Sequence, residues 1–176
     1  MNDPSRNILI TALMALSLSA FAQVNVPFEA EAGLIAPPFI ATNGYVVQPL
    51  ETNFANSGRA QFDIIISQAG SYVIRANVSS PDHPSSVYVN IDAEPTAPNM
   101  IWDIPLSLEF TNRTVTWRSD GTPTDNGCCP KVFNLTSGSH QLIIRGGVAG
   151  ARLDRFSIVP FTRPPAPIKL RIVPTP

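Results

Sequence analysis

Short runs of β-branched and aromatic residues, separated by turn residues, recur along most of this chain. In residues 71–79, Tyr72, Ile74, Ala76 and Val78 alternate with the residues of the other face, which is the period of a half-buried β-strand. No segment shows the 3.6-residue period of an amphipathic helix. The pattern predicts an all-β fold, either a sandwich or a barrel. The expected strands span residues 26–32, 44–48, 60–66, 71–79, 86–92, 100–104, 113–119, 131–136, 140–146 and 152–160.

Two clusters of turn residues lie between expected strands, at residues 68–71 and 136–139. Each contains Gly and Ser, which favour tight turns because Gly accepts positive φ and Ser bonds to nearby backbone. We predict a hairpin turn at each cluster.

The N-terminus has the layout of a secretory signal peptide. Residues 8–22 form an apolar run, and Ala20, Phe21 and Ala22 supply a small-residue cleavage pattern before Gln23. The run is too short for a comfortable membrane span of about 20 residues. We expect a signal peptide over residues 1–22 and a protein that is secreted to an extracellular, periplasmic or cell-surface location. An uncleaved membrane anchor is the alternative.

The charge distribution bears on the class of partner. The 12 Lys and Arg residues are scattered among 13 Asp and Glu residues, and the net charge is −1. A nucleic-acid-binding surface needs a basic stripe, and the sequence contains none. Charged residues make up only 14% of the chain, so the surface suits a polymer of neutral sugars better than a polyanion.

The last residues change in character. A Pro-rich segment begins at Phe161, and the sequence "PAPIKLRIV" within residues 161–176 resembles the first strand of a fibronectin type III domain. The mature domain would then span residues 23–160 as a monomeric module tethered to further domains. A disordered C-terminus is the alternative.

The two cysteines, Cys128 and Cys129, are neighbours. Adjacent Cα atoms lie about 3.8 Å apart, below the usual disulfide range of about 4.4–6.8 Å, so a bridge between them is a strained ring. Such a bridge closes almost no loop and cannot join distant strands. Three states stay open for an exported protein: a vicinal disulfide, two free thiols, or a link to another chain.

Two acidic residues, Glu29 and Glu31, lie two positions apart in the first expected strand, so both carboxylates point to one face. Asp154, in the last expected strand, would lie beside them if the first and last strands pair. Three carboxylates with backbone carbonyls suit calcium. The alternatives are a solvent-facing polar stripe, or carboxylates paired with Arg59 or Arg155.

Four segments carry a resemblance to a known family through their order along the chain. They are "FEAEAG" (28–33), "AGSYVIRANVSSP" (69–81), "VYVNID" (87–92) and "LIIRGGVAGARLDRFSI" (142–158). Together they resemble carbohydrate-binding modules of the family 6 and family 35 type, over residues 27–160. The resemblance implies a β-sandwich jelly roll of the galactose-binding-domain-like kind. It also implies a secreted module that binds polysaccharide or oligosaccharide, and a structural calcium ion on Glu29, Glu31 and Asp154.

The same resemblance implies that sugars stack on aromatic side chains of loops at one edge of the sandwich. Those families carry an Asn just ahead of the closing strand, where this chain has Ala151 and Arg152, so the usual cleft is in doubt. The candidate ligand-binding residues are Tyr45, Trp102, Trp117, Asp120, Asn126 and Arg152. A place in the core is the alternative for Trp102 and Trp117, because sandwich cores commonly bury a Trp.

Catalytic groups are scarce. The two histidines, His83 and His140, lie in a Pro-flanked turn and before a strand, and the chain has no nucleophile elbow or metal-binding His pair. A glycosidase needs two carboxylates that face each other across a cleft, whereas Glu29 and Glu31 face alike. We therefore expect no enzyme activity, although the module can be an accessory domain of a glycoside hydrolase. The competing hypothesis is a structural or adhesive spacer without sugar affinity.

Overall fold

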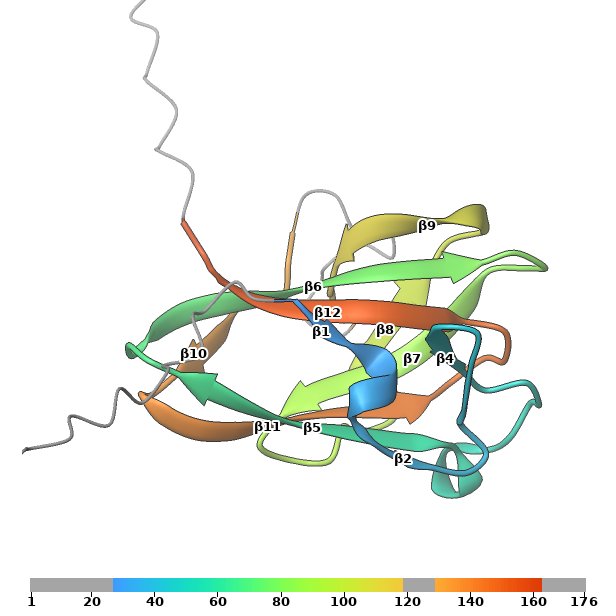
Figure 1. Ribbon diagram of the computed structural model, residues 1–176, viewed down its shortest axis with the longest axis horizontal. Coiled ribbons are helices and arrows are strands. Elements are labelled where there is room, and N and C mark those ends of the chain that lie inside the picture. The colour runs from blue at the N-terminus through green and yellow to red at the C-terminus, as the bar shows by residue number, and fades with distance from the viewer. Residues whose placement is uncertain (1–26, 119–128, 163–176) are drawn as a thin grey trace, which may run out of the picture.

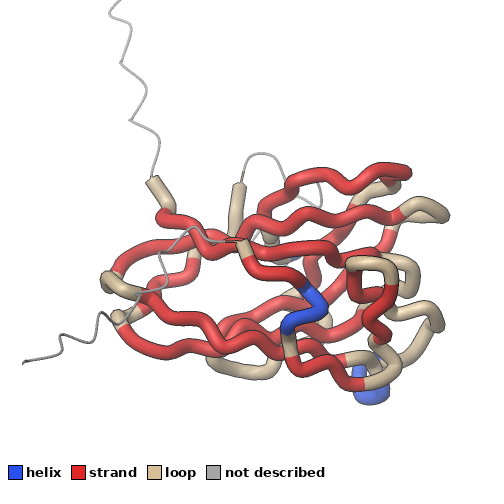
Figure 2. The backbone as a smooth tube through the Cα atoms, viewed as in Figure 1, coloured by secondary structure: helices blue, strands red, loops and turns tan. Residues whose placement is uncertain are grey.

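The computed structural model describes residues 27–118 and 129–162, which form two antiparallel β-sheets packed face to face (Figure 1). Strands make up most of this part of the chain, and the loops gather at the two ends of the sandwich (Figure 2). The architecture confirms the all-β prediction, and it is the jelly roll that the resemblance implies.

We call the two sheets A and B. Sheet A contains β1 (Phe28–Glu29), β3 (Ile40–Thr42), β4 (Tyr45–Val47), β6 (Gly70–Ser80), β9 (Ser107–Thr114), β10 (Phe133–Leu135) and β12 (Arg152–Pro160). Sheet B contains, in spatial order, β2 (Leu34–Ala36), β5 (Arg59–Ile66), β11 (Gly138–Gly146), β7 (Ser85–Ile91) and β8 (Ile101–Ile104). Two short 3-10 turns complete the structure, η1 (Ala30–Ala32) and η2 (Phe54–Asn56).

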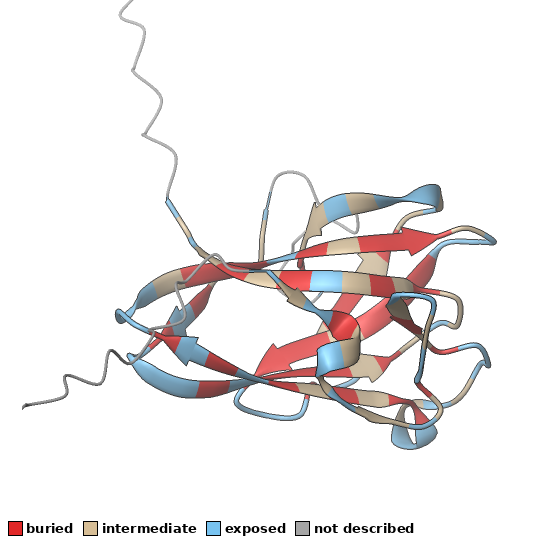
Figure 3. Ribbon diagram, viewed as in Figure 1, coloured by how far each residue is buried: buried red, intermediate tan, exposed pale blue. Residues whose placement is uncertain are grey.

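The long strands β6 and β12 pair along the middle of sheet A. Ile74 and Val78 of β6 are fully buried, as the alternation predicts. Figure 3 shows buried stretches, in red, on strands of both sheets. In β12 a β-bulge lies between Leu153 and Arg155. The buried positions are therefore odd-numbered up to Leu153 and even-numbered from Phe156 onward. Burial of these apolar faces between the sheets is the main source of stability.

The first and last described strands pair, as the calcium hypothesis requires. Phe28 of β1 lies opposite Phe156 of β12, and Glu29 lies opposite Arg155. The ring of Phe28 lies 5.4 Å from Phe62 of β5 and 6.0 Å from Phe156, centroid to centroid. This aromatic cluster fixes β1 against both sheets.

Several local predictions are wrong. The strand expected at 113–119 lies earlier in the chain, as β9, which ends at Thr114. The apolar residues Leu108 and Phe110 of β9 are exposed, so they do not mark a buried face. The strands β2 and β3 are too short for the pattern to reveal. The predicted hairpin turns at 68–71 and 136–139 instead lie where the chain crosses from one sheet to the other, since β5 and β6, and β10 and β11, belong to different sheets.

Several predictions lie outside the described residues. They are the signal peptide over 1–22, most of the segment 161–176, and the positions Asp120, Asn126 and Cys128. Cys129 is described and exposed. Within the described ranges, no helix is both long enough and apolar enough to span a bilayer.

The buried His140 joins the start of β11 to the end of β7. Its Nδ1 lies 2.6 Å from Oδ2 of Asp92, and its Nε2 lies 2.9 Å from the carbonyl oxygen of Thr136. Both partners are acceptors, so the ring satisfies both only when each nitrogen carries a proton. The hydrogen bond to Asp92 raises the pKa of His140, despite its burial. Burial tends to raise the pKa of Asp92, but hydrogen bonds from His140 and from the Gln141 N–H hold it below its usual value.

This pair predicts a pH dependence of stability. Stabilisation by the raised pKa of His140 is complete below about pH 6.5 and is lost as the pH rises through the folded-state pKa. Stabilisation by the lowered pKa of Asp92 is complete above about pH 4 and is lost as the pH falls. We expect the free energy of unfolding, measured in urea, to decrease as the pH rises above about 6.5. His140→Gln should remove this decrease, and His83→Gln should retain it. A wild-type slope in His140→Gln would contradict the assignment.

Candidate functional site

Both tryptophans belong to the core. Trp102 lies on the inward face of β8 and is 0% exposed, so no sugar can stack on its ring in this structure. Trp117 is 7% exposed, and its Nε1 donates a hydrogen bond to the carbonyl oxygen of Val89 (2.9 Å). Its ring meets Phe133 edge-on at 5.8 Å, and Nζ of Lys131 lies 3.9 Å from the centroid of the Trp117 ring. The proposed stacking roles of Trp102 and Trp117 therefore do not fit, because packing between the sheets occupies both rings.

Tyr45 and Arg152, by contrast, lie together. The pairing of β4 with β12 places both on the outer face of sheet A, since their neighbours Val46 and Leu153 are buried against sheet B. Cζ of Arg152 lies 5.3 Å from the centroid of the Tyr45 ring, a cation–π distance. Phe110 of β9 approaches the same ring to 5.9 Å and is 37% exposed. We call Tyr45, Phe110 and Arg152 the platform.

The sequence pattern does not identify Phe110, because the strand predicted at 113–119 begins six residues after the first residue of β9. The only available signal was the run Leu106, Leu108 and Phe110, in which apolar residues alternate with polar ones. All three side chains are exposed, so the alternation marks an outward-facing apolar row, not a buried one.

A polar groove of about 480 Å³ lies on the same outer face, next to the platform. Its polar lining residues come from three adjacent strands, and they are Arg75, Asn77, Asn112, Arg155 and Ser157. Pro27, Ala76, Phe156 and Val159 complete the lining. We call this feature the sheet A groove.

A larger concavity, of about 700 Å³, lies where the β6–β7, β8–β9 and β11–β12 loops meet. Its lining residues are Pro84, Ser85, Ser86, Asp103, Ile104, Pro105, Leu106, Arg113, Arg118 and Val148. Nε of Arg118 donates to Oδ2 of Asp103 (2.6 Å), and Nη2 donates to Oδ1. These hydrogen bonds raise the pKa of Arg118, so its guanidinium group is positively charged where it lines this concavity. We call the concavity the loop pocket.

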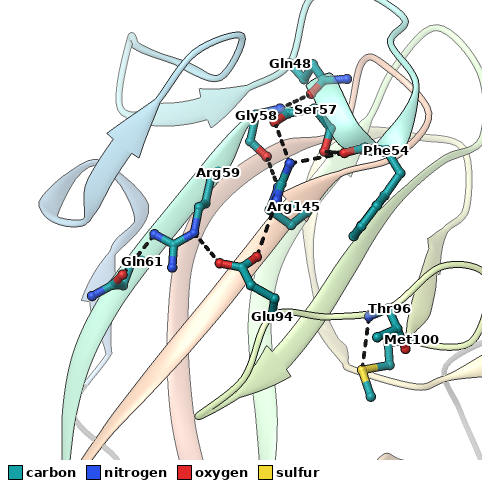
Figure 4. A network of polar contacts seen from close by, with 10 residues as sticks. All are labelled: Gln48, Phe54, Ser57, Gly58, Arg59, Gln61, Glu94, Thr96, Met100 and Arg145. Carbon is teal, nitrogen blue, oxygen red and sulfur yellow. Dashed lines mark hydrogen bonds and ion pairs between the residues drawn. The ribbon is translucent and has the colours of Figure 1, made fainter.

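Arg145 of β11 binds the backbone of the loop between β4 and β5 (Figure 4). Nη2 of Arg145 donates to the carbonyl oxygens of Phe54 (3.1 Å) and Ser57 (3.2 Å), and Nε donates to that of Gly58 (3.3 Å). Glu94 pairs with the same guanidinium at 3.4 Å. These hydrogen bonds and the ion pair anchor the β4–β5 loop to β11.

The predicted metal ligands are only partly assembled. Glu29 and Glu31 do not share a strand face, because β1 ends at Glu29 and the next three residues form η1. Oδ2 of Asp154 accepts hydrogen bonds from Nδ2 of Asn77 (2.6 Å) and Nε of Arg155 (3.1 Å). Among residues 27–118 and 129–162, no three acidic, His or Cys side chains gather as a metal site. Oε2 of Glu31 is nevertheless buried without a hydrogen-bond partner, which fits a cation ligand.

Comparison with solved structures identifies the class of the fold. The chain superposes on a GH26–CBM35 β-(1,4)-mannanase of Podospora anserina with a TM-score of 0.58 and 14% identity, covering 82% of this chain and 29% of the enzyme. It superposes on a family 35 carbohydrate-binding module of Clostridium thermocellum with a TM-score of 0.55 and 13% identity, covering 77% of this chain and 98% of the module. An isomalto-dextranase of Arthrobacter globiformis T6 gives a TM-score of 0.56 and 13% identity, with 77% of this chain and 23% of that one covered.

The chain thus has the fold of a family 35 carbohydrate-binding module of the galactose-binding-like type. It spans less than a third of the mannanase and of the isomalto-dextranase, and nearly the whole of the isolated module. No model of a known protein family matches the sequence, and no curated protein does either.

The hydrogen bonds that anchor the β4–β5 loop predict the effect of one substitution. Gln48 is buried, and its Oε1 accepts a hydrogen bond from the Gly58 N–H (2.8 Å) while its Nε2 donates to Thr52 (3.1 Å). Gln48→Ala leaves the buried Gly58 N–H without a partner, so the free energy of unfolding in urea should drop by about 1–3 kcal/mol. The exposed control Gln68→Ala should stay within about 0.5 kcal/mol of wild type. Equal stabilities for the two variants would refute this role.

Proposed function

We propose that this protein is a secreted, non-catalytic module that binds a neutral polysaccharide on the platform. The observation that carries the proposal is the meeting of Tyr45, Phe110 and Arg152 on a solvent-facing sheet surface. An aromatic ring packs against the C–H face of a sugar and buries apolar surface, while a guanidinium donates hydrogen bonds to hydroxyl groups at the ring edge. The platform offers both.

The three platform residues lie on β4, β9 and β12, which are held by antiparallel pairing within sheet A. Phe110 lies where the register between β9 and β6 shifts. Rigid elements hold binding groups more accurately than loops do. The fold neighbours support the same class of ligand, because they include a carbohydrate-binding module and enzymes named for mannan and isomalto-dextran.

The competing hypothesis, a spacer or protein-binding module, has one observation in its favour. Both tryptophans are buried, so neither offers a stacking surface. The accessible ring of Phe110 and the neighbouring Tyr45 favour the carbohydrate hypothesis instead. We further propose that the module is tethered to other domains, as the coverage of multidomain enzymes by this fold suggests.

Binding to polysaccharide is tested with Phe110→Ala. Isothermal titration against soluble β-1,4-mannan, β-1,3-galactan and dextran should show binding to at least one polymer. The substitution should weaken that binding about tenfold, the effect of losing one exposed aromatic contact. Leu34→Ala, which removes an exposed apolar side chain from β2, should bind like the wild type. The proposal fails if no polymer binds, or if Phe110→Ala binds as tightly as the wild type.

A structural calcium ion is part of the proposal. Glu31 would hold it through the buried, unpartnered Oε2, and Glu29 and Asp154 lie on the strands that border η1. An ion bound only to the folded state raises the melting temperature. Millimolar calcium should therefore raise the melting temperature of the metal-stripped protein, and Glu31→Gln should abolish the increase. Glu109→Gln, an exposed change on β9, should leave it intact. A melt that is identical with and without calcium would end the calcium proposal.

A further inference from the structure

The platform and the sheet A groove form one continuous strip. Three cross-strand rows connect β6 to its neighbours: Ser79 lies opposite Arg152, Asn77 lies between Asn112 and Arg155, and Arg75 lies between Thr114 and Ser157. All these side chains face away from sheet B, because the alternate positions of β6 are buried. From Ser79 to Arg75 the strip is about 14 Å long, at 3.4 Å per residue. Figure 1 shows β6 and β12 running side by side along this face.

The groove end of the strip contains two polar side chains that make no hydrogen bond to the described part of the chain. Arg75 and Asn112 are exposed, and neither side chain is hydrogen-bonded to the described part of the chain. Asn77 and Arg155 are both fixed by bonds to Asp154. In the groove, Asn77 and Arg155 are therefore held in place by Asp154. The side chains of Arg75 and Asn112 are exposed and can bond to a ligand.

The charged side chains that line the groove are Arg75 and Arg155. Nε of Arg155 is paired with Oδ2 of Asp154 at 3.1 Å. Both guanidinium groups are hydrogen-bond donors, and sugar hydroxyl groups can accept from them.

Ser79, opposite Arg152, is 0% exposed, so its small side chain is fully covered by its neighbours. The groups that a ligand can contact at this end of the strip are therefore those of Tyr45, Phe110 and Arg152.

We infer that this strip, from Tyr45 and Phe110 to Arg75 and Asn112, binds several consecutive sugar residues of a neutral glycan lying along the strands. A single sugar would contact the platform alone. The inference rests on the proposed function, and it adds the groove as a second part of the binding surface. It places the recognised unit on the sheet face and leaves the loop pocket out of it.

Chain length tests the inference. The probes are mannobiose and mannohexaose, the matching β-1,3-galacto-oligosaccharides, and isomaltose and isomaltohexaose, measured by isothermal titration. In the series that binds, the hexasaccharide should bind at least about tenfold tighter than the disaccharide, because it reaches the groove. The double variant Arg75→Ala/Asn112→Ala should lower hexasaccharide affinity to the disaccharide level and leave disaccharide affinity unchanged. Both residues are exposed and unbonded, so the variant should fold normally.

Glu109→Ala is the matched control, because it removes an exposed side chain of β9 that does not line the groove. It should retain the full length dependence. Equal affinities for the short and long sugars, or a double variant that binds hexasaccharide as the wild type does, would overturn the inference while the platform function stands. Failure of every probe, together with failure of the three polymers, would overturn the proposed function and the inference with it.

Discussion

The pairing of β6 with β12 is the interaction on which the rest of the structure depends. Its ladder runs from Arg152 opposite Ser79 to Pro160 opposite Tyr72, and every other strand of sheet A except β3 pairs with one of these two strands. The inward side chains of the pair supply much of the core, and the outward ones supply the groove and part of the platform. One backbone ladder therefore fixes both the stability of the sandwich and the geometry of its candidate binding surface.

Much of the fold could be predicted from the sequence, because burial on one face leaves a period-two pattern. The pattern located β6, β7 and β11 well, since their inward positions are mostly apolar and buried. It missed β2 and β3, whose three residues are too few to show a period. It could not separate a hairpin from a crossover, because the same Gly and Ser residues serve both, and only long-range pairing tells them apart.

The site was less predictable, because a ligand surface depends on which side chains remain uncovered. Tyr45 and Arg152 are both ligand candidates in the sequence, but only the pairing of β4 with β12, which the sequence does not state, brings them together. A Trp is as suitable for a core as for a sugar, and the sandwich used both tryptophans for the core. Phe110 was overlooked because an exposed aromatic on an edge strand leaves no burial pattern. The carboxylates Glu29 and Glu31 were misplaced because a 3-10 turn replaces the end of the expected strand.

The bulge in β12 has a consequence for recognising distant relatives. Upstream of it the odd-numbered position Leu153 is buried, and downstream the even-numbered Phe156 and Ile158 are buried. A related chain that lacks the extra residue would carry its apolar positions in the opposite phase over half of the strand. Any comparison of such chains must therefore permit a one-residue gap at Asp154, or conserved core positions will be matched with surface positions.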